Sequence, residues 1–157
     1  MNYSQNHMIQ KYKCFLDTNI LLYFILESSK YFEETRDLIL SMRADNADIC
    51  ISPLVLDEFI YQLDFLTRKG DRKRKDYYEL AQIFTHSVTS IPGAKILEIP
   101  SDKSTLPELV RLMKKYNLKP RDAYHLLTML ENGVDYIATY DKDFDKVIES
   151  GIIRKYN

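Results

Sequence analysis

The stretch FLDTNILLYF, residues 15–24, places an acid between two apolar segments. The residues KCFLD (13–17) are typical of a short buried strand, and NILLYFILE (19–27) is expected to form a helix. A carboxylate at this junction can cap the helix. It can also lie at the carboxyl edge of a parallel sheet, where such folds bind ligands. The stretch therefore favours an α/β fold and makes Asp17 a candidate functional residue.

Short strands and helices continue to alternate along the chain. Further strands are expected at DICIS (48–52), AKILEIP (94–100), VDYIATYD (134–141) and, last, IIRKYN (152–157). Helices are expected at 31–44, 53–70, 76–88, 105–117, 120–133 and 143–151, where apolar residues recur near the helical period or Pro and Gly mark the ends. This order predicts βαβ units and a three-layer α/β/α fold with a short, mainly parallel central sheet.

Length and composition suit an ordinary globular chain of one domain, residues 1–157. No apolar run approaches the roughly 18 residues of a membrane span, and the first 13 residues lack the apolar core of a signal peptide. We therefore expect a cytoplasmic protein. Cys14 and Cys50 lie inside expected strands, where cysteine acts as a small buried apolar residue.

Positive charge is concentrated in RKGDRKRK, residues 68–75, although the chain as a whole has a net charge of −1. Outside this segment 16 basic residues face 22 acidic ones, a net charge of −6. The segment can be a solvated helix end and loop, or it can contact a polyanionic partner. A second basic run at 111–121 favours contact with a polyanion. The candidate phosphate contacts are Arg68, Lys69, Arg72, Lys73, Arg74, Lys75 and Arg121.

Four acids lie where the expected fold would bring them together. Asp17 ends the first strand, Glu58 lies in the helix after the second, Asp122 begins a later helix, and Asp141 ends the strand YIATYD. Taken singly, each can be a helix cap, a partner of a helix dipole or a solvated side chain. Taken together, crowded carboxylates repel one another unless a cation holds them.

Oxygen ligands without a Cys or His set predict a hard cation, Mg²⁺ or Mn²⁺, and phosphoryl chemistry. The short polar residues Thr18, Asn19 and Thr139 are expected to orient the carboxylates. Asp57 stands beside Glu58, and Asp143 and Asp145 follow Asp141, so the apolar pattern leaves open which of these acids enter the site.

These residues resemble the PIN domain ribonucleases and, among them, the small VapC-type toxins. The resemblance rests on FLDTNILLY, LVLDEFIYQL, RDAYHLLTML and IATYDKDFD, in this order over residues 14–145. It implies that Asp17, Glu58, Asp122 and Asp141 hold the metal ion, that Asp143 supports the site, and that Thr139 is the small hydroxyl residue before the last acid.

The resemblance further implies a metal-dependent endoribonuclease, an antitoxin protein that blocks the acidic site, and a homodimer. Two features depart from compact toxins of the family: the basic segment, and residues 1–12 as an N-terminal extension. Two other functions stay open: a PIN-like module that binds RNA or protein without cutting, and an RNA-processing PIN nuclease without an antitoxin. A dehalogenase-type phosphatase would need an acid where Asn19 stands.

The chain contains 12 tyrosines and no tryptophan. Tyr23, Tyr124 and Tyr140 lie next to the candidate site in sequence, where unpaired bases could stack on them, although tyrosines more often serve as packing residues. His125 follows Asp122 by three positions on the same helical face, and a packing role is favoured over a direct one.

Overall fold

A computed structural model describes residues 11–69, 74–89, 93–99 and 102–157, except for the side chains of 67–69, 74–77 and 87–89. The strands are β1 (Lys13–Leu16), β2 (Asp48–Ile51), β3 (Lys95–Ile96), β4 (Tyr136–Ala138) and β5 (Arg154–Lys155). The helices are α1 (Thr18–Ile25), α2 (Phe32–Ala44), α3 (Pro53–Lys69), α4 (Arg74–Thr89), α5 (Thr105–Tyr116), α6 (Pro120–Glu131) and α7 (Asp145–Glu149), with a 3₁₀ turn η1 (Lys142–Phe144).

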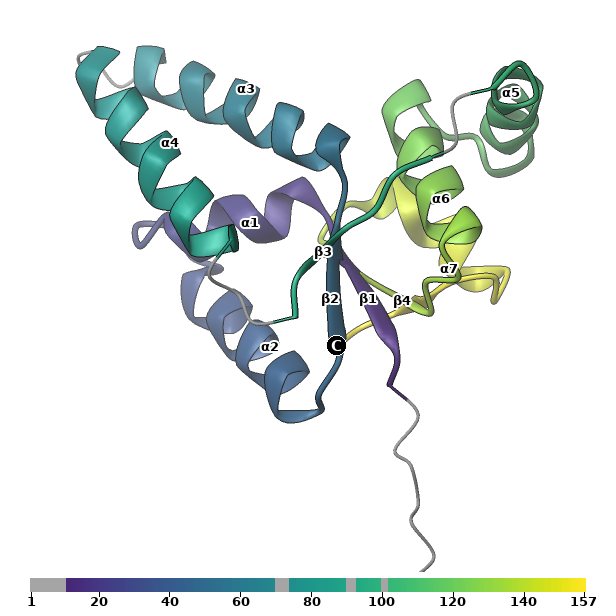
Figure 1. The fold of residues 1–157 in the computed structure, drawn as a ribbon, viewed down its shortest axis with the longest axis horizontal. Helices are drawn as coiled ribbons and strands as arrows, with labels where there is room; N and C mark the ends of the chain where they lie inside the picture. The colour runs from purple at the N-terminus through teal and green to yellow at the C-terminus, as the bar shows by residue number, and fades with distance from the viewer. Residues whose placement is uncertain (1–10, 70–73, 90–92, 100–101) are drawn as a thin grey trace, which may run out of the picture.

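The strands form one parallel sheet in the order β3-β2-β1-β4-β5. In Figure 1 the sheet lies between α1 to α4 on one side and α5 to α7 on the other. The three-layer α/β/α fold expected from the sequence is thus confirmed. The chain leaves β1 toward β2 but later returns to its other side as β4, so the carboxyl edge between β1 and β4 is a topological switch point, where ligands bind in such sheets.

The central strands are buried on both faces, as parallel strands covered by helices must be. Cys14, Phe15 and Leu16 of β1 are fully buried, and α3 and α6 contribute Phe59 and Leu126 to the same core. Apolar residues on both faces of β1 explain why its sequence is a continuous apolar run rather than an alternating one. Cys14 and Cys50 are buried thiols, as expected.

Three strands are markedly shorter than their sequence patterns predict, and one of them is β5, which has two residues rather than six at the other edge of the sheet. The third strand along the chain is an edge strand of two residues, Lys95–Ile96, because it has only β2 to pair with. The fourth ends at Ala138 rather than at Asp141, because the Tyr140 and Asp141 N–H groups bind the Asn19 and Thr139 side chains rather than a neighbouring strand, and the chain then turns into η1. Among the described residues no helix has the length and apolarity to cross a membrane.

Candidate active site

Asp17 ends β1 and is the N-cap of α1. Its Oδ1 accepts a hydrogen bond from the Thr18 backbone N–H at 2.7 Å, and its Oδ2 accepts bonds from Asn19 Nδ2 at 2.6 Å and Thr139 Oγ1 at 2.5 Å. The residue is only 7% exposed, and this burial raises the pKa of its carboxyl group. The carboxylate is therefore held in one orientation in a place where its negative charge is costly.

The segment after β4 joins the same network. The buried Thr139 hydroxyl, which donates to Asp17, also accepts a bond from the Asp141 backbone N–H at 2.9 Å. Asp141 in turn caps η1 by accepting a bond from the Asp143 N–H at 2.9 Å. A single hydroxyl thus ties the carboxyl ends of β1 and β4 together and fixes the position of Asp141.

Glu58 reaches the site from α3 and is 9% exposed, whereas the adjacent Asp57 is exposed to solvent. Its Oε2 accepts a hydrogen bond from Thr18 Oγ1 at 2.8 Å and lies 3.0 Å from His125 Nε2. Its Oε1 is 3.5 Å from Arg121 Nη1. Burial opposes ionisation of Glu58, but the His125 hydrogen bond and nearby positive charge outweigh it and lower the pKa of the carboxyl group.

Asp122 lies in the first turn of α6 and is half buried. Its Oδ2 is buried and has no hydrogen-bond partner within the described part of the chain. Burial, followed by the negative charges of Asp141 and Asp143, raises the pKa of Asp122 to about 6. An unpaired buried carboxylate oxygen beside like charges is a position that a cation would stabilise.

The acids lie close enough together to shift one another's pKa values, but basic side chains of the protein form ion pairs with two of them. Lys119 Nζ lies 2.5 Å from Asp143 Oδ2, and Arg121 contacts Glu58. In the described ranges no three Asp, Glu, His or Cys side chains are grouped as a ready-made metal site. The chemistry of the donors, together with the orphaned Asp122 oxygen, nevertheless fits a divalent cation.

His125 also belongs to this network, although the sequence pattern favoured a packing role for it. The residue is 1% exposed, and Nε2 is placed to donate a hydrogen bond to Glu58. Its Nδ1 is buried without a partner among the described residues. Its spacing of three from Asp122 was the available signal, but only the packing of α6 against α3 reveals the contact with Glu58.

The remaining predicted residues divide into three groups. Asp143 lies beside Asp141, whereas Asp145 is exposed at the start of α7. Arg121 lies at the site, with a side chain 56% exposed and a contact to Glu58. The other candidate phosphate contacts fall outside the residues or side chains that the structure describes, namely Arg68, Lys69, Arg72, Lys73, Arg74 and Lys75.

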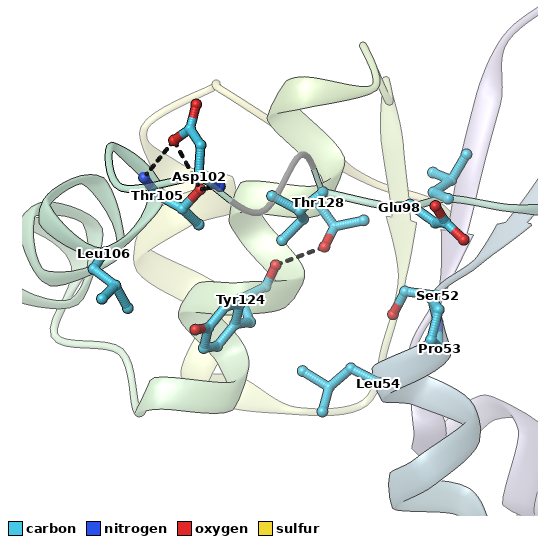
Figure 2. Close-up of a pocket in the computed structure, with 11 residues that line it drawn as sticks. Ser52, Pro53, Leu54, Glu98, Asp102, Thr105, Leu106, Tyr124 and Thr128 are labelled. Atoms are coloured by element: carbon cyan, nitrogen blue, oxygen red, sulfur yellow. Dashed lines mark hydrogen bonds between the residues drawn. The ribbon is translucent and has the colours of Figure 1, made fainter.

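Tyr124 lines a pocket of its own rather than the group of acids. Figure 2 shows its ring in a pocket of about 490 Å³ between the start of α3 and the middle of α6, with Leu54 and Thr128 also in the lining. None of the four candidate metal-binding acids lines this pocket. We therefore do not place Tyr124 in the acidic site.

Comparisons with known proteins identify the family of this fold. The PIN domain family model matches residues 14–149. Ribonuclease VapC6 of Methanocaldococcus jannaschii is 24% identical over 153 residues, 90% of this chain and 96% of the relative. Ribonuclease VapC2 of the same organism is 27% identical over 149 residues, 88% of this chain and 91% of the relative.

Among solved structures, VapBC2 from Rickettsia felis, bound to a DNA fragment from their promoter, has the same fold. The TM-score is 0.58 at 21% identity, and the match covers 92% of this chain and 99% of that one. Together with the family-model match over most of the chain, these findings show that the protein belongs to the PIN domain family.

Proposed function

We propose that this protein is an endoribonuclease that depends on Mg²⁺ or Mn²⁺ and is the toxin of a type II toxin–antitoxin pair. The observation that carries the proposal is the linked set of Asp17, Glu58, Asp122 and Asp141 at the switch point of the sheet. The matches to ribonucleases VapC6 and VapC2 support RNA as the substrate.

The four acids would hold the cation, with Asp143 in support. When bound, a divalent ion supplies positive charge that favours deprotonation of a nearby water and stabilises negative charge on phosphate oxygens. Thr18, Asn19 and Thr139 orient the carboxylates by hydrogen bonds, so little reorganisation is needed when the ion binds.

His125 and Arg121 both contact Glu58, and in the proposal only Arg121 also contacts the substrate. The His125 Nε2–H holds Glu58 Oε2 in place and favours its charged form. The exposed Arg121 guanidinium is long enough to exchange its contact with Glu58 for an RNA phosphate. In this proposal Arg121 pairs with Glu58 in the free protein and binds an RNA phosphate in the complex.

We also propose an antitoxin protein and a second copy of this chain as partners. The antitoxin is implied by the likeness to VapC-type proteins, one of which is seen in the VapBC2 structure. Expression of the chain alone, and then with the product of a neighbouring gene, followed by size and activity measurements, tests both partners. Growth arrest relieved by the neighbouring gene is expected, and an active nuclease that no neighbour inhibits would favour an RNA-processing role.

The central test compares wild type with Asp17→Asn on a mixed set of structured and single-stranded RNAs, in Mg²⁺, Mn²⁺ or EDTA. We expect metal-dependent cutting by wild type and a loss of orders of magnitude in Asp17→Asn. Since the Asp17 carboxyl group is destabilised by burial, the neutral Asn should keep the fold, and the thermal midpoint in EDTA should not fall. Tight RNA binding without any cutting would instead favour a binding module.

A further inference from the structure

Three tyrosine rings pack together close to the acidic site. The ring centroids of Tyr31 and Tyr140 are 4.8 Å apart with an interplanar angle of 28°. Tyr23 lies 4.9 Å from Tyr31 and 5.6 Å from Tyr140. We call these three residues the tyrosine cluster. It gathers aromatic surface from α1, from the residue before α2 and from the segment after β4.

The tyrosine cluster is joined to the acidic site through the backbone. Tyr140 stands between Thr139 and Asp141, and its N–H donates to Asn19 Oδ1 at 3.1 Å. Tyr23 follows Asn19 by four positions on α1, so the two side chains share a face, about 6 Å apart along the helix axis. The rings therefore begin about one helical turn from the hydrogen bonds that hold Asp17.

The cluster is only partly used for packing. Tyr140 packs against the hydrophobic core, and its hydroxyl lies 3.3 Å from Thr35 Oγ1. Tyr23 and Tyr31 are half buried, and neither is among the described residues that pack against the core. The exposed Lys30 places its ammonium group 4.7 Å from the centroid of the Tyr31 ring. Partly exposed rings with a cation beside them are the elements of a single-strand binding surface.

We propose that the tyrosine cluster stacks an unpaired nucleobase of the RNA strand held at the acidic site. Every base presents a π face, so such stacking tolerates different sequences and requires a single-stranded segment. Lys30 would contact a phosphate of the same strand. The inference rests on the proposed ribonuclease function and adds that an unpaired nucleotide beside the cleaved bond is part of the recognised substrate.

The test is the affinity for short single-stranded RNAs that each carry one abasic nucleotide, measured in an Asp17→Asn background with Mg²⁺ so that the RNA stays intact. With the cluster intact, loss of the base at one position should weaken binding roughly 5- to 150-fold, the range measured for base–aromatic stacking. In Tyr23→Leu and Tyr31→Leu this penalty should largely disappear. In Tyr23→Phe and Tyr31→Phe it should persist, because the ring remains.

Tyr61→Leu is the matched control, because Tyr61 is 64% exposed on α3 and outside the cluster. Its abasic penalty should equal that of the Asp17→Asn parent. Circular dichroism and thermal midpoints of all variants show whether each is folded, and the Phe variants test the rings even if a Leu variant unfolds. An unchanged penalty in folded Leu variants overturns the inference, as does a penalty lost equally in the Phe variants. The inference is also overturned if the cluster substitutions weaken binding of a protein partner but leave RNA affinity unchanged.

RNA cleavage by the protein without the Asp17 substitution, measured in parallel, separates this inference from the proposed function. If the protein cleaves RNA but the abasic penalty does not depend on the tyrosine rings, only this inference is overturned and the proposed nuclease function stands. Ring-dependent base binding without any cleavage would overturn the nuclease and leave the stacking site in place.

Discussion

Asp17 is a helix cap and, in the proposed function, also a metal ligand. It caps α1 through the Thr18 N–H while Thr139 and Asn19 orient its other oxygen. Asp141 repeats this arrangement at η1. A cap places a carboxylate at the start of a helix, which in a parallel sheet is also the edge where ligands bind. The two interpretations of these acids are therefore compatible.

The pair Asp57 and Glu58 offers a matched experiment at this scale. Glu58→Gln should lower RNA cleavage by more than about 100-fold, because even the partners of metal ligands cost 10- to 100-fold when mutated. Asp57→Asn removes the same charge from an exposed position and should leave cleavage within about twofold. Initial cleavage rates at saturating Mg²⁺ compare the two. Equal effects of both variants would exclude a special role for Glu58.

Asp122 predicts a pH dependence of stability in the metal-free protein. Because its pKa is raised to about 6 from 3.8, the folded state favours the protonated form. Protonated Asp122 contributes fully to the stability of the folded state below about pH 4, and this contribution is lost as the pH rises toward 6 and above. In EDTA, the thermal midpoint of Asp122→Asn minus that of wild type should therefore increase from pH 4 to pH 7. A difference that does not change with pH would contradict the prediction.

At the scale of elements, the start of α6 brings opposite charges to one place. Pro120 is suited to the first turn of this helix, and Asp122 follows it in the same turn. Lys119 and Arg121, on either side of Pro120, contact Asp143 and Glu58. These cations relieve the repulsion among the acids but compete with any metal ion for the same oxygens.

Arg121→Gln should therefore change metal and RNA binding in opposite directions. Release of Glu58 should tighten Mn²⁺ binding, measured by titration calorimetry without RNA. Removal of one cation that binds a phosphate should weaken RNA binding and reduce the slope of log affinity against log salt by about 0.7. Arg154→Gln is the control, because Arg154 packs over Tyr136 at the amino end of β4. Weaker Mn²⁺ binding in Arg121→Gln would contradict the competition.

At the scale of the whole molecule, the charge is divided between a mostly acidic chain and the basic segment 68–75. The parallel sheet collects acids at one edge because each strand delivers its carboxyl end there. In the proposed function an RNA strand approaches this edge, and the acids there repel its phosphates. We propose that the positive charge of the basic segment attracts the RNA strand.

Substitution of Arg72, Lys73 and Arg74 by alanine tests this division of charge. The triple variant should bind RNA more weakly and lower the salt slope by up to about 2, at roughly 0.7 for each phosphate that the protein no longer neutralises. Fluorescence anisotropy with labelled RNA at several salt concentrations measures it. An unchanged slope would mean that the segment is only a solvated surface.

The sequence alone determined the order of the elements, the fold class and the four acids to be examined. These are local properties, because apolar periodicity, Pro120 and Gly133 define elements through residues close together in the chain. The acid at the end of the strand KCFL and the short polar residues after it were equally visible. The strand lengths were less so, because pairing partners rather than composition decide where β3 and β4 stop.

Only the tertiary structure decided which side chains meet. The rotation of α3 against α1 and α6 turns Glu58 inward and leaves Asp57 outside, and the same packing places His125 against Glu58. The tyrosine cluster joins segments more than 100 residues apart. Contacts of this kind depend on how helices pack over a shared sheet, and no short sequence pattern contains that information.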